Sequence, residues 1–142
     1  MSSEHNLFSD SEAYEHSMGR LSRVAGKKFL DWLYLPSGLR WLDVGCGTGS
    51  FTELLLDCCA PSAISAIDPT EEQIAFAKSK PSASRIDYRQ ADAIYLPFGD
   101  NEFEAAVMAL VIQYIPDRMK AMSELTRVVC QGGTVSAYVW PG

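Results

Sequence analysis

The 142-residue chain lacks the features of several large classes of protein. It contains no run of lysine or arginine, and its 12 basic and 18 acidic residues give a formal net charge of −6. Since binding to a phosphate backbone depends on clustered positive charge, we expect neither nucleic acid nor a membrane surface as a partner. No apolar run approaches the ~20 residues that span a bilayer. Residues 1–5 lack the basic and apolar regions of a secretory signal, so we expect a cytoplasmic location.

Residues that bind metals or form disulfides are also few. The two histidines lie near the N-terminus, and the four cysteines include no C-x-x-C spacing. A structural zinc site needs four ligands at turn-like spacing, so we expect no metal. A disulfide between the neighbouring Cys58 and Cys59 would be strained in a helix. We therefore expect reduced thiols, with Cys58, Cys59 and Cys130 packed and Cys46 the thiol that a bound ligand protects from alkylation.

The apolar pattern alternates between strand-like and helix-like segments. The expected helices cover 11–35, 50–59, 70–79 and 117–129, and the expected strands cover 40–44, 63–67, 85–89, 103–109 and 134–140. Thr70 and Gln73 have the spacing of a capping box, and Gly132 with Gly133 is expected to end the last helix. Strands that alternate with helices predict one α/β domain, built on an open, mostly parallel five-stranded sheet with helices on both faces.

The most informative segment is the glycine-rich stretch W-L-D-V-G-C-G-T-G-S at 41–50. It joins a buried strand to a helix, where Gly45 and Gly47 would allow positive φ and a close approach of the backbone to a ligand. Asp68 ends the next strand, 19 positions after Gly49. That distance suits a carboxylate that accepts hydrogen bonds from both hydroxyls of a ribose.

Three aspartates accompany three successive strands: Asp43 within the first, Asp68 at the end of the second and Asp92 just past the third. In a parallel sheet all three would lie along the carboxyl edge, where nucleotide-like ligands bind. Each element also has a plainer interpretation, since a glycine triplet can be simply a tight turn and an aspartate that ends a strand is often a helix cap. The joint order and spacing favour a cofactor site. The spacing G-x-G-x-G differs from the dinucleotide pattern G-x-G-x-x-G, which disfavours a nicotinamide cofactor.

Four segments taken in order resemble the class I S-adenosylmethionine (SAM)-dependent methyltransferases that share the small-molecule methyltransferase core. The segments are WLDVGCGTGSFTELLL, SAIDPTEEQIAFAKSK, QADAIYLPFGDNEFEAAVMALVIQYIPD and RVVCQGGTVSAYVW. They span about 38–140, and the preceding EAYEHSMGRLSRVAGKKFLDWL resembles the helical lead-in of the group. The resemblance implies a Rossmann-like core at 37–142, SAM as cofactor, and a helical segment at 1–36 that caps the cofactor site.

The resemblance also implies which residues surround the methionine portion of SAM. The backbone of Gly45–Gly47, with Cys46 between the glycines, would pass beneath this portion, and Asp43 would orient it. A carbonyl within Ala109–Leu110 would meet its ammonium group. Arg20, with Tyr14 nearby, is a candidate partner for its carboxylate. For Arg20, a solvated helix charge is at least as good an interpretation.

The adenosine portion is assigned in the same way. Asp68 would hold the ribose hydroxyls, with Pro69 and Thr70 beside the adenine. Asp92 would accept a hydrogen bond from the adenine amino group, and the backbone N–H of Ala93 would donate one to the ring.

The chain departs from the group in two respects. The acid that often follows the Phe103 position is Glu104 here, which we interpret as a surface change. The group's sheet normally has seven strands, but the matching segments supply five, without the antiparallel pair that covers the fifth strand and helps to wall the substrate site. The strand at 134–140 carries no charge, so we expect self-association through its free edge, or dependence on a C-terminal region. The alternative is that Pro141–Gly142 and local twist keep the domain monomeric.

The leading hypothesis is an enzyme that transfers a methyl group from SAM to a small-molecule acceptor, which the sequence does not identify. Because the sulfonium of SAM is already activated, positioning supplies most of the rate, and we assign no side chain as a catalytic base. A second hypothesis is a SAM-binding module without independent catalysis, either a fragment or a subunit that needs a partner. A third, an NAD(P)-dependent oxidoreductase, is disfavoured by the glycine spacing and by the helical segment before the first strand.

Overall fold

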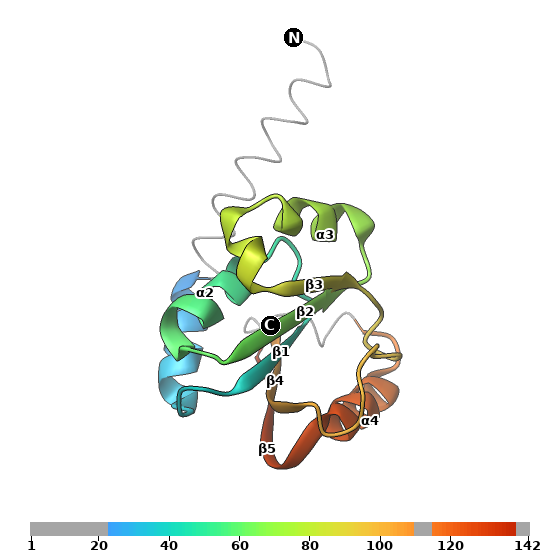
Figure 1. Cartoon of the computed structure of the whole chain (residues 1–142). Helices are drawn as coiled ribbons and strands as arrows, with labels where there is room; N and C mark the ends of the chain where they lie inside the picture. Colours follow the sequence, from blue (N-terminus) through green and yellow to red (C-terminus); the bar gives the residue numbers. More distant parts are fainter. Residues whose placement is uncertain (1–22, 110–114, 139–142) are drawn as a thin grey trace.

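The computed structural model describes residues 23–109 and 115–138, which form a five-stranded sheet flanked by helices (Figure 1). Its strands are β1 (Arg40–Val44), β2 (Ala63–Asp68), β3 (Asp87–Gln90), β4 (Phe103–Ala109) and β5 (Val129–Tyr138). Its helices are a segment at 23–33, α2 (Ser50–Cys59), α3 (Glu71–Lys78), the short 3-10 helix η1 (Pro81–Arg85) and α4 (Arg118–Val128). The strand order is β3-β2-β1-β4-β5 and every pairing is parallel, which confirms the expected open α/β sheet.

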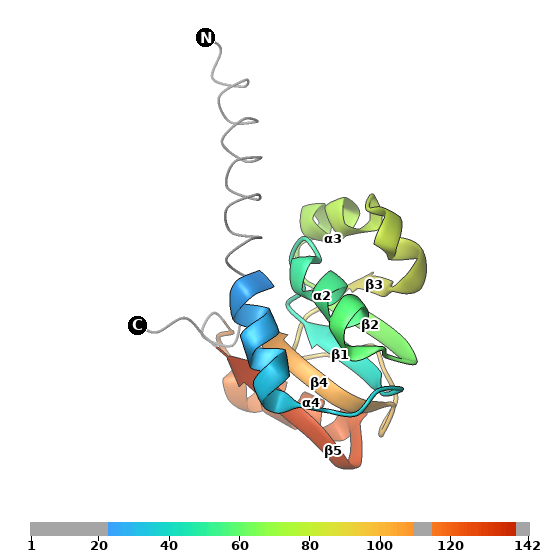
Figure 2. The same ribbon diagram turned by 90° about the vertical axis from the view of Figure 1, so that its left-hand side faces the viewer.

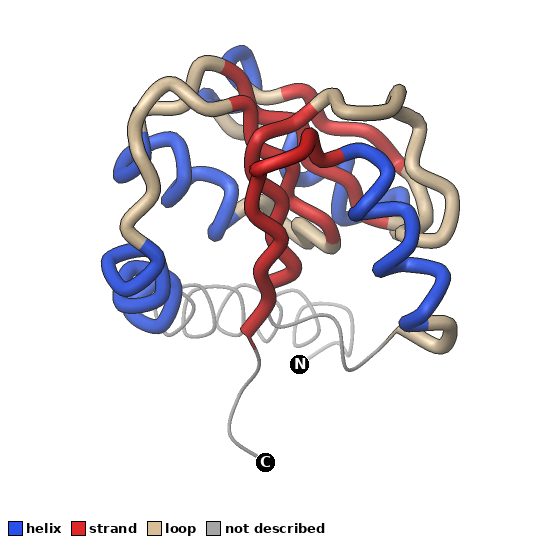
Figure 3. The backbone as a smooth tube through the Cα atoms, turned by 90° about the horizontal axis from the view of Figure 1, so that it is seen from below, coloured by secondary structure: helices blue, strands red, loops and turns tan. Residues whose placement is uncertain are grey.

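The sheet has helices on both of its faces, as the views in Figures 2 and 3 show. Alternate residues of a strand point to opposite faces, so Trp41 of β1 packs with the cluster formed by the 23–33 segment, α2 and α3. Its neighbour Leu42 packs with the cluster that includes α4. Both side chains are almost completely buried. The short apolar strand predicted at 40–44 is therefore the two-sided centre of the sheet.

The path of the chain into β5 differs from the expectation. Helix α4 ends at Val128 and β5 begins at Val129, so Gly132 and Gly133 bend a strand and do not terminate a helix. The register shifts there, with Phe103 opposite Val129 but Ala105 opposite Thr134. The extra residues form a bulge, a feature for which glycine is well suited.

Two further expectations need correction. The 3-10 helix η1 occupies Pro81–Arg85, so β3 begins at Asp87 and not at residue 85. Glu104 is more than a surface change, because its carboxylate accepts hydrogen bonds from the backbone N–H of Arg40 at 3.0 Å and from the Nε of Arg40 at 2.6 Å. This pair links β4 to β1 at their amino ends, and Arg40 holds the pKa of Glu104 below its usual value.

In the part of the chain that the structure describes, no helix has the length and apolar character needed to cross a bilayer. The expected residues Tyr14, Arg20 and Leu110 lie outside the described ranges, as do Trp140, Pro141 and Gly142.

The β5 bulge leads to a prediction about stability. A Cβ added at Gly133 would lie 2.7 Å from the carbonyl oxygen of Glu104 and 2.9 Å from that of Cys130, and backbone atoms have little room to move. We expect Gly133→Ala to lower the free energy of unfolding by roughly 1–3 kcal/mol, the usual cost of overpacking. Urea unfolding measures this, with Gly99→Ala as the matched control, because a Cβ at Gly99 meets nothing within 4 Å. Equal losses in the two variants would contradict the account.

Candidate functional site

A cavity of about 310 Å³ lies at the carboxyl ends of β1, β2 and β3. Its lining residues are Val44, Gly45, Ile67, Asp68, Pro69, Thr70, Ala91, Asp92, Ala93, Ile115 and Pro116. The site therefore brings together six of the residues expected from the sequence, drawn from three separate loops. Ile115 and Pro116 lie at the end of the third of the segments that resemble the methyltransferases, but no site role was expected for them, and the fold brings them to the cavity.

The glycine loop after β1 is held against β2 by its own backbone. The N–H groups of Gly45 and Cys46 both donate to the carbonyl of Ile67, at 2.8 and 2.9 Å. Gly45 and Gly47 have φ values of 80° and 56°, as expected. Among the described residues, a Cβ at Gly47 would meet nothing within 4 Å, so this part of the loop is open on the side that they form. A ligand can therefore approach the bare backbone closely at Gly47.

Gly49, the third glycine of the loop, is required for a reason that the sequence did not reveal. It precedes α2 with a φ of 91°, and an added Cβ would lie 2.4 Å from the hydroxyl oxygen of Tyr88. Tyr88 is the buried residue of β3, whose other side chains are exposed. The tyrosine thus supports the glycine loop from the side of β3, and no local pattern signals this contact.

Asp68 joins the loops of the site to one another. Its Oδ2 accepts a hydrogen bond from the N–H of Gly47 at 3.0 Å, and its Oδ1 accepts one from the N–H of Thr70 at 2.9 Å. The Asp68 carbonyl accepts the N–H of Ala91 at 3.1 Å, which adds the loop after β3. Each carboxylate oxygen can accept a further hydrogen bond, so the geometry suits a ligand that carries two neighbouring hydroxyls.

The capping box expected at Thr70 is not formed. Thr70 is the N-cap residue of α3, but its side chain makes no cap hydrogen bond. Its N–H is instead bound by Asp68, which precedes it by two residues. The buried carboxylate fixes the turn that the hydroxyl was expected to fix.

Asp92 shapes a turn and lies in the cavity lining. Its Oδ1 accepts a hydrogen bond from the N–H of Ile94 at 3.2 Å, and its carbonyl accepts the N–H of Tyr95 at 3.0 Å. It therefore shapes a local turn. It also lines the cavity beside the half-buried Ala93, and it is exposed.

Asp43 lies beneath the site and does not line the cavity. It is fully buried, and its Oδ2 accepts a hydrogen bond from Thr52 Oγ1 of α2 at 2.7 Å. Its Oδ1 has no hydrogen-bond partner within the described ranges. Burial raises the pKa of Asp43 to about 7; the Thr52 bond opposes this shift and the charge of Asp68 adds to it. Thr52 was not expected as the partner of Asp43, because no pattern in the sequence links the two residues.

The thiols do not follow the expected pattern. Cys58 is exposed, so the expectation that it is packed is wrong, whereas Cys46 is buried in the cluster under α2. Burial raises the pKa of the Cys46 thiol, which disfavours the reactive thiolate. Cys46 is absent from the cavity lining, as are Gly47 and the half-buried Ala109. Protection of Cys46 by a ligand stays a prediction.

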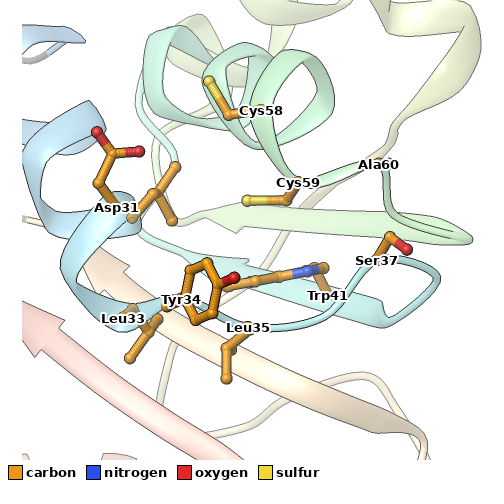
Figure 4. Close-up of a pocket in the computed structure, with 10 residues that line it drawn as sticks. Asp31, Leu33, Tyr34, Leu35, Ser37, Trp41, Cys58, Cys59 and Ala60 are labelled. Carbon is orange, nitrogen blue, oxygen red and sulfur yellow. The ribbon is translucent and has the colours of Figure 1, made fainter.

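A second cavity, of about 500 Å³, lies at the opposite end of the sheet, by the start of β1 (Figure 4). It is lined by the end of the 23–33 segment, by Trp41 and by Cys58 and Cys59 at the end of α2. It contains none of the aspartates or glycines described above, so the smaller cavity is the candidate cofactor site.

The burial of Asp43 predicts how stability depends on pH. An unfolded aspartate titrates near 3.9, so between pH ~4 and ~7 the folded protein holds a proton that the unfolded chain has lost. The Asp43 contribution to stability is therefore greatest below pH ~4, falls as the pH rises to about 7, and is constant above that value. We expect Asp43→Asn to remove this slope in urea unfolding measured from pH 5 to 8. Exposed Asp57→Asn is the control; parallel profiles for wild type and Asp43→Asn would show that Asp43 does not titrate in this range.

Comparison with known proteins agrees with this geometry. The profile of a methyltransferase domain family matches residues 42–137, from β1 to β5. Demethylmenaquinone methyltransferase of Bacillus licheniformis is 33% identical over 110 residues, which cover 76% of this chain and 47% of that protein. The chain thus spans about half the length of this curated relative.

Solved structures show the same fold. The [4+2]-cyclase SpnF superposes with a TM-score of 0.69 and 29% identity, covering 84% of this chain and 43% of its own. A putative SAM-dependent methyltransferase of Methanococcus maripaludis gives a TM-score of 0.78 at 18% identity, with 91% and 60% covered. With the glycine loop, Asp68 and Asp92 around one cavity, the chain belongs to the class I SAM-dependent methyltransferase family, whose cofactor is S-adenosylmethionine.

Proposed function

We propose that this chain binds SAM at the carboxyl edge of its sheet and serves the transfer of the methyl group to a small-molecule acceptor. The observation that carries the proposal is the Asp68 carboxylate, which lies in the cavity wall and joins the loops that follow β1 and β2. The family of the chain supports the same chemistry, and the relative described above is named for a small-molecule acceptor.

We propose that the adenosine half of SAM occupies the described cavity. In our proposal, Asp68 accepts hydrogen bonds from the ribose hydroxyls, and Pro69 and Thr70 lie beside the adenine. Asp92 accepts from the adenine amino group while the N–H of Ala93 donates to the ring. The supporting observation is that all five residues line one cavity, although they come from two different loops.

The methionine half would lie over the glycine loop, where Gly47 leaves open space. We propose that Asp43 acts on this half through α2 and the loop, because its carboxylate is buried and bonded to Thr52. A carbonyl of Ala109 or Leu110 for the ammonium group, and Arg20 with Tyr14 for the carboxylate, remain proposals, as does a capping role for residues 1–36.

When bound, SAM supplies a methyl group that its sulfonium already activates. The residues of this chain would bind and orient the cofactor and exclude water from one side of it, and none is assigned to proton transfer. We propose a cytoplasmic location on the basis of four free cysteines. A module that binds SAM but needs further chain or a partner for catalysis is the second candidate. One observation that favours this candidate is that the match covers only 47% of the relative described above. The other is that β5 pairs only with β4 among the described strands.

Binding measurements test the cofactor assignment. By calorimetry we expect SAM and its demethylated product to bind and NAD not to bind. Asp68→Ala should weaken binding by about 1–3 kcal/mol, because it removes the acceptor for two buried hydroxyls and releases both loops. Exposed Asp57→Ala, on the outside of α2, should leave the affinity unchanged. Tight binding of NAD without SAM binding would refute the proposal, and an unchanged affinity in Asp68→Ala would remove Asp68 from the site.

The edge of β5 that no described strand pairs with leads to a second proposal, that the chain self-associates through this strand. Its ten residues, VCQGGTVSAY, carry no charge to block pairing. We expect wild type to associate with rising concentration in sedimentation velocity, and Ala137→Lys, at an exposed position of the strand, to remain monomeric. Met119→Lys is the control, because it removes an exposed apolar side chain from α4 without changing β5. Loss of association in both variants, or a wild type that is monomeric throughout, would exclude pairing through the edge.

A further inference from the structure

The loop between β3 and β4, which carries Asp92 and Ala93, is held by two arginines at three consecutive carbonyls. Arg127 of α4 donates from Nη2 to the carbonyl of Leu96 at 3.1 Å and from Nη1 to that of Phe98 at 2.8 Å. Arg89 of β3 donates from Nη1 to the intervening carbonyl of Pro97 at 2.9 Å. Backbone carbonyls in an irregular segment need such partners, since no strand or helix supplies them.

Glu124, one turn before Arg127 on α4, binds the same segment. Its Oε1 accepts the N–H of Leu96 at 2.9 Å, and its Oε2 accepts Arg127 Nε at 2.7 Å. Glu124 is only 8% exposed, and Arg127 holds its pKa below the usual value. The two side chains orient each other, so we treat Glu124 and Arg127 as one unit, the α4 clamp.

The far end of the segment is fixed to the same helix. Arg127 Nη1 also donates to Asp100 Oδ1 at 3.0 Å, and the Arg127 carbonyl accepts the N–H of Asn101 at 3.0 Å. Leu96 and Phe98 are buried in the cluster on the α4 side of the sheet. The guanidinium of Arg89 lies 4.7 Å from the centre of the Phe98 ring. The loop is therefore anchored at each residue from Leu96 to Phe98 and again at Asp100 and Asn101.

Residues 91–95 lie between these anchors and β3, and they include the part that lines the cavity. Asp92 is held by bonds within its own turn, to Ile94 and Tyr95. Its position relative to Asp68 is therefore set from both ends, by the Asp68–Ala91 hydrogen bond and by the segment that the clamp fixes.

We infer that Glu124 and Arg127 are positioning residues that hold Asp92 and Ala93 in place for the adenine of the cofactor, although neither touches the cavity. This inference rests on the proposed function. A loop that is ordered before binding avoids the entropic cost of becoming ordered during binding. If the loop also samples other positions, the apparent affinity falls in proportion to the fraction of molecules in the binding-competent position.

The test uses Arg127→Lys, which keeps the charge but cannot reproduce the planar fork that reaches two carbonyls and Glu124. Arg85→Lys, at the end of η1, is the matched control. We expect Arg127→Lys to weaken SAM binding roughly tenfold, the usual scale of coupling between neighbouring groups, and Arg85→Lys to leave it unchanged. In the Asp92→Ala background, Arg127→Lys should cause a smaller loss, because only the Ala93 N–H is left to position, whereas in the Asp68→Ala background it should still cause the full loss. Equal losses in all three backgrounds would indicate a general structural role and overturn the inference.

Hydrogen exchange without ligand separates this inference from the proposed function. We expect the amides of residues 91–95 to exchange faster in Arg127→Lys than in wild type, while the amides of β1 and β2 are unchanged. Glu124→Gln should give a smaller effect in the same direction, because its amide oxygen can still accept from Leu96. Unchanged exchange in both variants would refute the clamp even if SAM binds. Faster exchange in a protein that fails to bind SAM would refute the proposed function and leave the clamp as a purely structural device.

Discussion

The hydrogen bonds of the Asp68 carboxylate are the interaction on which the rest of the site depends. They tie the glycine loop at Gly47 to the turn at Thr70, while the Asp68 carbonyl holds Ala91. This is possible because β2 lies between β3 and β1, so the end of β2 is the position from which both neighbouring loops are within reach. The cavity is therefore shaped before a ligand arrives, which limits the ordering that binding would require.

The glycine loop is also supported by buried groups that do not line the cavity. Asp43 is bonded to Thr52 of α2, and the buried Tyr88 occupies the space that a side chain at Gly49 would need. A buried ionised carboxylate with one unpaired oxygen would be costly, and the raised pKa of Asp43 reflects that cost. Asp43, which the resemblance placed beside the methionine portion of the cofactor, is therefore part of the support of the glycine loop.

Much of the fold could be predicted because its signals are local. The apolar run at 40–44 and the glycine spacing after it define β1 and α2, and the same order of strands predicted the positions of Asp68 and Asp92 around one cavity. The failures arose where a distant partner decides the outcome. Gly132 and Gly133 could equally stop a helix or bend a strand, and the choice depends on the close packing of Gly133 against the backbone of β4. Tyr88, far from Gly49 in sequence, gave no local signal of its contact.

The loop that carries Asp92 shows how an irregular segment can be as well defined as a strand. Its carbonyls are bound by Arg89 and Arg127, which reach it from β3 and from α4. Helix α4 supplies no residue to the cavity lining, yet it determines where one wall of the cavity lies. Because α4 passes directly into β5 at Val129, the position of Arg127 in turn depends on the edge strand of the sheet. The edge strand β5, α4 and the loop that carries Asp92 are thus one connected unit. This unit joins the edge left unpaired among the described strands to the wall that would hold the adenine.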